Sequence, residues 1–332
     1  MISSAVAFAT LVLVAGFRDR SVGTDTEAYV NGFANLRTFA DAWKESSLEP
    51  GYLILTYVTR AISSDYWVLL TAIALVVVFC FMRSIYMFSD SPAISLFVFI
   101  TMGYYTFFFN GARQGLAFAI YSLAIGPLIH GNFKKYAFWV LVAFCFHKSV
   151  IVALPLYFLF RQKNTLRYVL QMVAVATITI LYFSTFLNIG VLISDKYMIY
   201  QELEATGGEL LTLFYVLLSV FFFYFKYAIP LSERQRYDCL LNMLIFGSTI
   251  FVVVSLSGGY VELTRLAIYF QMASIFLWPI VLRNIRKSKK RFLFEYAFAL
   301  SHIGYFYIFI NKMAGLVPYK INETLMHNLW FF

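Results

Sequence analysis

Long apolar stretches recur along the whole chain, and several of them reach the length that a membrane crossing requires. A spanning helix needs about 20 mostly apolar residues, and residues 66–88 supply such a stretch. Hydrophobic residues make up 61% of the 332 residues and charged residues 13%, whereas about a quarter of a typical soluble domain is charged. Because backbone polar groups must be paired inside a bilayer, these stretches predict helices. We expect an all-α polytopic integral membrane protein that forms a single transmembrane domain over residues 1–332.

The lengths and spacing of the apolar stretches indicate about ten transmembrane helices, some of them short or re-entrant. Residues 1–17 carry no charge and no basic leading segment, which is typical of a membrane helix rather than a cleaved signal peptide. Residues 51–62 are apolar but too short to span, so they predict an interfacial helix. Full spans are predicted at 66–88, 92–108, 112–129, 168–187, 210–229, 238–257 and 266–282.

Basic segments between these stretches set the expected orientation. RNIRKSKKR at 283–291, SERQR at 232–236 and RQKNTLR at 161–167 are rich in lysine and arginine, and such loops stay on the cytoplasmic side. This bias accounts for the formal net charge of +9, so the charge does not indicate nucleic-acid binding. Two larger polar segments then face outward. One is an extracytoplasmic loop with the interfacial helix at 18–62, and the other is a second extracytoplasmic loop at 188–209.

The apolar segment at 136–160 has basic residues at both ends, and both ends favour the cytoplasmic side. A single span would place one of these basic groups outside. The polar triplet HKS interrupts the segment in its middle. We therefore expect two short helices that form a hairpin, with His147 near its outer tip.

The three cysteines indicate neither a disulfide framework nor a metal site. Cys80, Cys145 and Cys239 lie in or beside apolar stretches at spacings that match no metal-binding pattern. The chain also lacks a glycine-rich phosphate loop, a nucleophile elbow and a zinc-protease motif. We expect no metal and no cofactor, so any chemistry must come from polar residues that the fold gathers.

A short polar group interrupts the apolar sequence FFFNGARQGLAFAI at 107–120. An arginine at the bilayer centre costs at least about 2.5–3.5 kcal/mol, so Arg113 needs a partner or a function. Asn110-Gly111 is typical of a turn, which predicts a tight hairpin between two membrane helices with Arg113 at its tip. Arg113 and Gln114 would then start a helix on the outer face, where a helix N-terminus and a guanidinium bind anions. The alternative is an interfacial arginine that snorkels and marks a helix end.

A second arginine has the same character. Arg265 follows SGGYVELT at the start of another predicted helix on the same face, and two such arginines suggest a clamp on a diphosphate. Tyr260, Tyr319 and Lys320 are candidates to line the same cavity, because aromatic faces suit sugars or prenyl chains. The alternatives are an interfacial anchor for Arg265 and a membrane-interface belt for the tyrosines.

Three residues are candidates for a general base. His147 lies in the apolar sequence FCFHKSV, and the ordinary pKa of histidine, near neutrality, suits a proton acceptor. Asp25 in VGTDTEAY and Glu49 in SLEPGY are carboxylates in turn-like contexts, able to act as a base or to bind sugar hydroxyls. The alternatives are a hydrogen-bonded structural histidine and solvated loop carboxylates. The sequence does not choose among the three.

Six short motifs, taken in order, resemble the EpsG family. They are VGTDTEAYVNGF, EPGYLIL, FFFNGARQGLAFAI, FCFHKSVIVALP, ELTRLAIYF and VPYK, and they extend over nearly the whole chain. That family is similar to the Wzy polysaccharide polymerases of bacterial envelope biosynthesis. On these motifs, the resemblance implies functional roles for Asp25, Glu49, Asn110, Arg113, Gln114, His147 and Arg265.

The resemblance also implies an activity and a location. We expect a multi-pass glycosyltransferase of the bacterial inner membrane whose active site is an extracytoplasmic-facing cavity. Its substrate would be an oligosaccharide repeat unit on undecaprenyl diphosphate, and its product an O-antigen, capsule or exopolysaccharide. A flippase and a chain-length regulator are the expected protein partners. Arg113 and Arg265 would hold the diphosphate without metal, while His147, Glu49 or Asp25 activates the acceptor hydroxyl.

Two other classes of function stay open at this point. A transporter or flippase would move a lipid-linked oligosaccharide without chemistry, and it predicts broken helices near mid-membrane with charges in both leaflets. A membrane acyl- or phosphate-group transferase would use the same lipid pool, with His147 as its base. The expected topology places the candidate residues on one face, which favours an enzyme that works from the outer side.

Overall fold

The structure is a computed structural model that describes residues 2–45, 48–163, 167–175, 177–178, 208–257, 261–285 and 291–322. The described residues form helices and turns without a β-strand, apart from one isolated antiparallel bridge between Arg18 and Ile321. They divide into two compact units. Unit 1 comprises the described parts of 1–126, 134–151 and 288–332, and unit 2 those of 127–133 and 152–287.

Among the described residues, five helices are long and apolar enough to cross a membrane, or six when one bent pair is counted as a span. The same residues contain three shorter apolar helices. The all-α, polytopic membrane class is therefore confirmed, whereas the count of about ten and the single-domain assignment stay predictions. The five are Tyr66–Phe88, Ala112–His130, Glu209–Ala228, Leu231–Leu256 and Arg291–Lys312, and the bent pair is Thr264–Gln271 with Ser274–Ile285.

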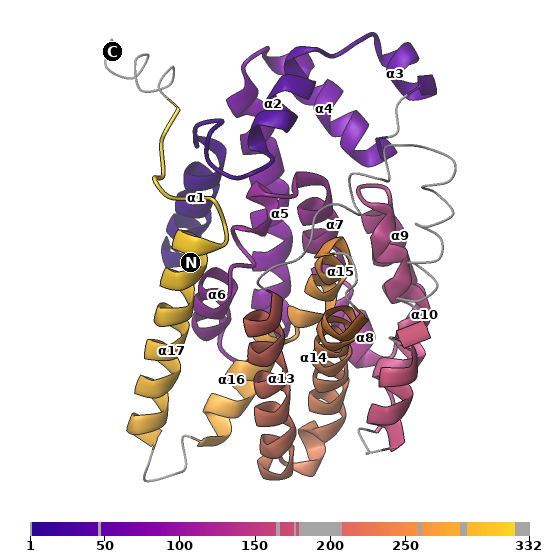
Figure 1. Ribbon diagram of the computed structural model, residues 1–332, viewed down its shortest axis with the longest axis vertical. Helices are drawn as coiled ribbons and strands as arrows, with labels where there is room; N and C mark the ends of the chain where they lie inside the picture. Colours follow the sequence, from indigo (N-terminus) through magenta and orange to yellow (C-terminus); the bar gives the residue numbers. More distant parts are fainter. Residues whose placement is uncertain are drawn as a thin grey trace. The chain divides into compact units, whose positions relative to one another are not determined.

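Unit 1 is organised around α5 (Tyr66–Phe88), which packs against α1 (Ile2–Gly16) and α7 (Ala112–Ser122) (Figure 1). Its apolar residues extend around the helix, as expected for a helix with neighbours on several sides. The Phe81 ring lies 4.5 Å from Phe99 and 4.9 Å from Phe118, measured between centroids. These contacts join α5 to α6 (Pro92–Thr101) and α7.

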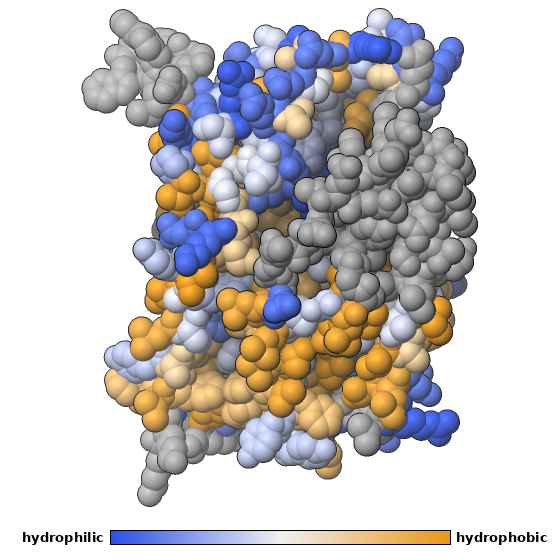
Figure 2. Space-filling view, in the orientation of Figure 1, coloured by the Kyte–Doolittle hydropathy of each residue, from blue (hydrophilic) through white to orange (hydrophobic). Residues whose placement is uncertain are grey.

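The segment predicted as a loop with an interfacial helix is itself largely helical. It contains α2 (Thr26–Ala34), α3 (Phe39–Glu45) and α4 (Pro50–Ile62), which gather at one end of unit 1 (Figure 1). Hydrophilic side chains cover this region in Figure 2. With 13 residues, α4 is too short to span a bilayer, so the short helix expected at 51–62 is confirmed.

The hairpin expected around Asn110 differs in its first half. Helix α7 begins at Ala112, directly after Asn110-Gly111 as predicted, but the preceding helix α6 ends at Thr101. Gly103 has a φ of 76°, the left-handed conformation that commonly ends a helix. One 3₁₀ turn, η1 (Phe107–Phe109), then leads into the turn. Ten residues (102–111) therefore separate the two helices, rather than the three expected from the predicted spans.

The break expected in the second predicted hairpin is present. Helix α9 (Phe133–Phe144) is followed by η2 (Lys148–Val152) and α10 (Ala153–Phe160), with the break at His147. The Phe133 ring lies 5.1 Å from the rings of Tyr157 and Phe158. Phe133, the first residue of α9, therefore lies beside α10, and the hairpin itself stays a prediction.

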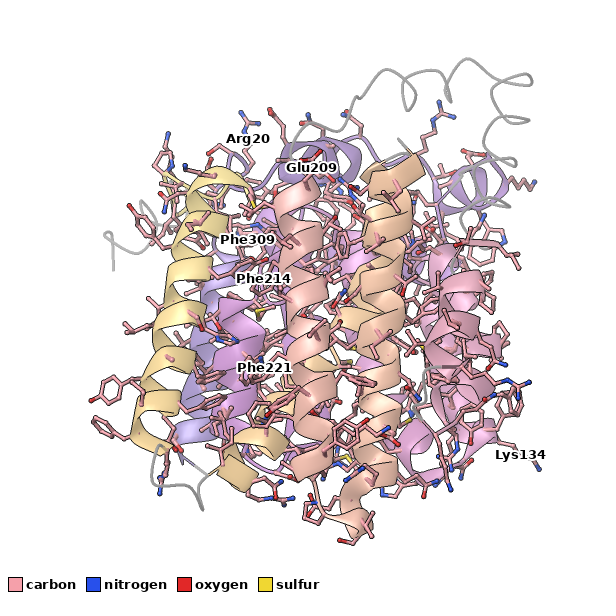
Figure 3. All side chains as sticks on the ribbon, turned by 60° about the horizontal axis from the view of Figure 1, so that its bottom comes forward. Arg20, Lys134, Glu209, Phe214, Phe221 and Phe309 are labelled. Atoms are coloured by element: carbon pink, nitrogen blue, oxygen red, sulfur yellow. The ribbon has the colours of Figure 1, made fainter. Side chains whose placement is uncertain are left out.

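Unit 2 is built on α14 (Leu231–Ser257), which packs against α13 (Gly208–Phe225) and α15 (Val261–Gln271). Figure 3 shows Glu209 at the start of α13, with Phe214 and Phe221 farther along it. Phe160 of α10 packs against Phe246 of α14 and Phe270 of α15, with centroids 5.8 and 5.6 Å away. Helix α15 is bent by 41° from α16 (Ser274–Ile285).

Candidate functional site

An ion pair between Arg113 and Glu49 lies at the centre of the candidate site in unit 1. Arg113 Nη1 donates to Glu49 Oε2 over 2.8 Å. Helix α4 begins with Pro50, and Glu49 precedes it in an extended conformation without capping the helix through its side chain. The carboxylate is therefore left for the guanidinium. Glu49 is 5% exposed and the Arg113 side chain 32% exposed, so the arginine is the partner that solvent reaches.

The turn that contains His147 contacts the same carboxylate. The backbone N–H of Lys148 lies 3.5 Å from Glu49 Oε1, and Gly51 N–H donates to the Cys145 carbonyl over 2.7 Å. A Cβ atom on Gly51 would lie 2.8 Å from that carbonyl oxygen, closer than packed atoms allow. A glycine at this position therefore permits the start of α4 to approach the 145–147 turn.

The contacts of His147 favour one tautomer of its neutral ring. Nδ1 lies 2.6 Å from Ser149 Oγ and 3.4 Å from the backbone nitrogen of Ser149. A backbone N–H only donates, so this pair of contacts favours Nδ1 as the acceptor. Neutral His147 then carries its proton on Nε2. In that tautomer the Nε2–H is the hydrogen-bond donor of the ring.

Tyr29 connects this ion pair to Asp25 and was not identified from the sequence. Its hydroxyl accepts a hydrogen bond from the Ala112 N–H over 3.1 Å, and it also interacts electrostatically with Arg113. Burial raises the pKa of the Tyr29 hydroxyl, although Arg113 partly opposes this shift, so Tyr29 stays protonated at neutral pH. Asp25 and Tyr29 are four residues apart on one face of a helix, which is the signal that could have identified Tyr29.

Asp25 is half-buried at the start of α2, and its charge acts on the Tyr29 hydroxyl. Its Oδ1 accepts a hydrogen bond from Thr24 Oγ1 over 3.1 Å. Within the part of the chain that the structure describes, Oδ2 has no hydrogen-bond partner. Asp25 therefore keeps more acceptor capacity than Glu49, whose Oε2 is held by Arg113.

Asn110 has both ends of its side-chain amide engaged by backbone groups. Oδ1 accepts from the Thr24 N–H over 3.0 Å, and Nδ2 donates to the Ala314 carbonyl over 2.7 Å. Gly23 N–H donates in turn to the Gly315 carbonyl over 3.1 Å. Asn110 thus ties the loop before α2 to the segment after α17 (Arg291–Lys312).

Other predicted binding residues of unit 1 have structural contacts. Gln114 is 6% exposed inside α7. The hydroxyl of Tyr319 donates to the Val14 carbonyl of α1, and the Lys320 carbonyl accepts from Asp19 N–H over 2.9 Å. The VPYK segment therefore runs alongside the residues that follow α1. The sugar-binding roles of these residues stay predictions.

The remaining two predicted residues belong to unit 2. Arg265 is exposed in the first turns of α15, as expected from its motif. Its pairing with Arg113 on one diphosphate stays a prediction. Tyr260 lies outside the described residues.

The site therefore combines one partly exposed guanidinium, a protonated tyrosine, a half-buried carboxylate and a histidine donor. Three separate segments supply these groups, which the sequence spreads from Asp25 to His147. A guanidinium has five N–H donors, so Arg113 can bind an anion while it keeps its bond to Glu49. Among the described residues, no group of three or more His, Cys, Asp or Glu side chains could hold a metal ion.

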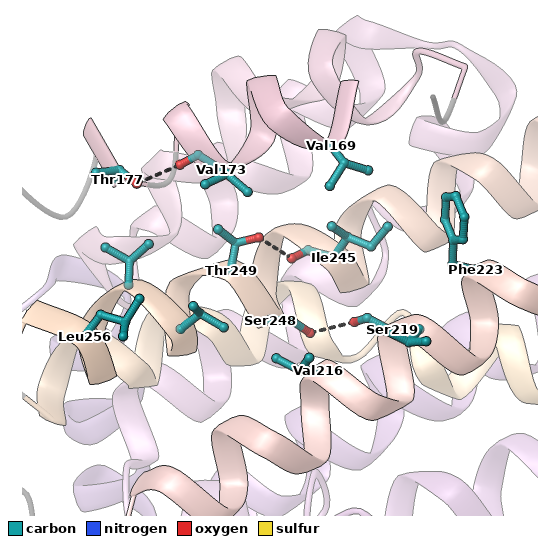
Figure 4. A pocket seen from close by; sticks show the side chains of 13 residues that line it. Val169, Val173, Thr177, Val216, Ser219, Phe223, Ile245, Ser248, Thr249 and Leu256 are labelled. Atoms are coloured by element: carbon teal, nitrogen blue, oxygen red, sulfur yellow. Dashed lines mark hydrogen bonds between the residues drawn. The ribbon is translucent and has the colours of Figure 1, made fainter. Parts of the chain in front are cut away.

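Unit 2 contains an apolar cavity of about 670 Å³ (Figure 4). Valines of the 167–175 segment, α13 and α14 line it, including Val173 and Val216. Its polar groups are already paired, because Ser219 and Ser248 share a hydrogen bond of 2.8 Å and Thr249 donates to the Ile245 carbonyl. Leu256 at the edge is 82% exposed, so the cavity opens to the surface. Its chemistry suits an aliphatic chain.

Comparison with protein families matches residues 1–321 to the EpsG family. No curated protein and no solved structure gave a match. The matched range contains all of the motifs from VGTDTEAY to VPYK. This family assignment, together with the membrane-length helices, is consistent with a membrane protein of polysaccharide biosynthesis. The chain belongs to the EpsG family.

Proposed function

We propose that this protein is a glycosyltransferase that polymerises lipid-linked oligosaccharide repeat units. The observation that carries the proposal is the cluster of Arg113, Glu49, Tyr29, Asp25 and His147, which the family's motifs supply in one unit of the fold. The donor is a repeat unit on undecaprenyl diphosphate, and the acceptor is a sugar hydroxyl of a second lipid-linked chain.

Arg113 binds the diphosphate in this proposal. Glu49 fixes one nitrogen of the guanidinium, and the 32% exposure of the side chain leaves other donors to face the substrate. Such charge-assisted bonds are stronger than neutral ones. They gain strength as negative charge develops on the leaving diphosphate, and one preorganised donor of this kind contributes about 2.7–4 kcal/mol.

Asp25 acts as the general base. The acceptor hydroxyl attacks the anomeric carbon of the donor sugar, and its proton passes to the Asp25 carboxylate. A carbon–oxygen bond to the acceptor forms as the bond between the anomeric carbon and the diphosphate oxygen breaks. The diphosphate leaves with the electron pair. Asp25 is preferred to Glu49 because its Oδ2 is unbonded among the described residues, whereas Glu49 Oε2 is bound to Arg113.

His147 and Glu49 have supporting roles. The Nε2–H of His147 donates to an oxygen of the diphosphate or of the glycan, because Nδ1 is engaged by Ser149. Glu49 is a positioning residue that holds the Arg113 guanidinium. The apolar cavity of unit 2 suits an isoprenoid tail. The positive-inside bias of the basic loops supports a site on the extracytoplasmic side of the inner membrane.

Reconstitution tests the proposal directly. Purified protein in lipid vesicles is supplied with the cognate undecaprenyl-diphosphate-linked repeat unit, and the glycans are separated by length. We expect a ladder of products and an equivalent release of undecaprenyl diphosphate. Arg113→Ala should abolish both, while Arg83→Ala, a change of the same kind on α5, should leave them intact.

Three outcomes would contradict the proposed polymerase activity. Inactive wild-type protein that is folded in vesicles with the cognate unit would refute it. Movement of the intact lipid-linked unit across the bilayer without a longer glycan would instead identify a flippase. Transfer of an acyl or phosphate group to the unit would likewise replace the polymerase by another transferase.

A further inference from the structure

A second cavity in unit 2 differs from the apolar one in being lined mainly by charged and amide side chains. Its volume is about 630 Å³. It lies where the end of α10, the short helix η4 (Lys226–Ala228) and the first two turns of α14 come together. The residues that line it are Arg161, Gln162, Lys163, Lys226, Leu231, Arg234, Gln235 and Asp238.

The charges around this cavity are strongly unbalanced. Four of its residues are lysine or arginine and one is a carboxylate, which gives 4 − 1 = +3. The carboxylate of Asp238 is already paired, with Lys226 Nζ 3.3 Å from its Oδ1. Lys226 is 8% exposed and Asp238 is 6% exposed, so this buried ion pair forms one side of the cavity. Arg161, Lys163 and Arg234 supply the excess positive charge.

The two arginines are fixed in place but retain free donors. Arg161 Nη1 donates to the carbonyls of Leu128 and Ile129, over 2.5 and 3.0 Å. Arg234 donates through Nη2 to the Ile229 carbonyl over 2.8 Å. Its buried Nε has no hydrogen-bond partner among the described residues. Because each guanidinium has five N–H donors, bound carbonyls orient these side chains without exhausting them.

We propose that this basic cavity binds a phosphate group, supplied by the headgroup of an anionic membrane lipid. Phosphate matches the excess charge and accepts several hydrogen bonds from arginine and lysine at once. The lipid source follows from the position of the cavity between two membrane-length helices, Glu209–Ala228 and Leu231–Leu256. A phosphate bound there lies at the depth of lipid headgroups.

Exposed apolar side chains beside the cavity support a lipid over a soluble phosphate. Leu231 lines the cavity and is 85% exposed, and Tyr227, in η4, is 71% exposed. Exposure of these apolar side chains to water is unfavourable, whereas at the membrane interface a tyrosine and a leucine can contact acyl chains. This site is separate from the Arg113 cluster and does not depend on the polymerase activity.

Native mass spectrometry of the purified protein in neutral detergent tests the proposal. Phosphatidylglycerol and phosphatidylcholine are added in equal amounts, and bound lipid is counted. We expect wild-type protein to retain phosphatidylglycerol preferentially. Arg234→Gln should weaken this binding about tenfold, because a hydrogen bond to a charged group contributes on the order of 1.4 kcal/mol or more. Arg236→Gln removes the same charge two residues away, outside the cavity lining, and should bind like wild type.

Two further arms complete the test. Lys163→Gln changes an exposed side chain, so it should weaken lipid binding without affecting folding. This variant replaces Arg234→Gln in the test if Arg234→Gln fails to fold.

Inorganic pyrophosphate is added in the absence of lipid, with thermal stability as the readout. Stabilisation by pyrophosphate that Arg234→Gln removes, without preferential lipid binding, would support a phosphate site with a soluble source. Equal binding of both lipids, or equal losses in Arg234→Gln and Arg236→Gln, would overturn the proposal.

Discussion

Arg113 and Glu49 are 64 residues apart in the chain, and their side chains meet at 2.8 Å. Glu49→Gln removes the charge that holds the guanidinium while keeping the size of the side chain. We expect a stability loss of about 1–3 kcal/mol, less than the roughly 3–5 kcal/mol for a fully buried pair, because Arg113 is partly exposed. Unfolding by detergent titration measures this loss, and polymerisation should fall with it.

The exposed pair Arg291–Glu295 provides the matched control. Its atoms lie 3.0 Å apart, but both side chains are at least a third exposed. Glu295→Gln should therefore cost at most about 0.5 kcal/mol. Equal losses in the two glutamine variants would show that the Glu49 pair has no special role.

Asp25→Asn should lower the polymerisation rate by about 10²–10⁴-fold, which is the usual contribution of a general base. The asparagine keeps the hydrogen bond from Thr24, so the unfolding curve should stay unchanged. Turnover of the lipid-linked repeat unit gives the rate. Glu27→Gln, an exposed position on the same helix, should behave like wild type. A fully active Asp25→Asn protein would exclude Asp25 as the base.

The proposed tautomer of His147 predicts different effects for two substitutions. Glutamine can place an N–H near the position of Nε2, whereas alanine cannot. His147→Ala should lose about 10²–10³-fold in rate, as for one donor to a developing charge, and His147→Gln should recover at least about a tenth of the wild-type rate. If His147 were the base, both variants would be equally inactive.

Gly51→Ala tests the contact between the start of α4 and the 145–147 turn. The added Cβ would lie 2.8 Å from the Cys145 carbonyl oxygen, so we expect a cost of about 1–3 kcal/mol from overpacking. Gly32→Ala in α2 is the control, because nothing lies within 4 Å of its Cβ position. That change should stabilise the protein by about 0.4–1 kcal/mol. Thermal unfolding of the two variants compares these effects.

Local signals in the sequence were sufficient for several helix boundaries. The predicted span 66–88 coincides with α5, because Asp65 and Ser89 bound a continuous apolar stretch. The HKS interruption gave the position of the break in the second predicted hairpin for a similar reason, since polar residues inside an apolar segment favour a break. Gly103 ends α6 in the structure, but an isolated glycine in an apolar stretch is a weak signal for a helix end in the sequence.

The contacts within the site depend on the tertiary fold and could not be derived from local patterns. Glu49 and Arg113 were each identified by their motifs, yet nothing in either motif indicates that one pairs with the other. The sequence suggested three candidate general bases and gave no reason to prefer one of them. The ion pair at Glu49 and the Ser149 contacts of His147 now favour Asp25. Gln114 is buried and Asn110 binds backbone groups, and their motifs indicate neither feature.

The sidedness of the His147 turn is tested with a cysteine that the chain already contains. Cys145 is exposed beside this turn, whereas Cys80 and Cys239 are buried. A membrane-impermeant maleimide should therefore label wild-type protein in intact cells, after the outer barrier is opened, and Cys145→Ser should abolish the labelling. Adding Lys148→Cys to that variant should restore it. Labelling that appears only when the cytoplasm is opened would reverse the predicted orientation and place the Arg113 cluster on the opposite side of the membrane.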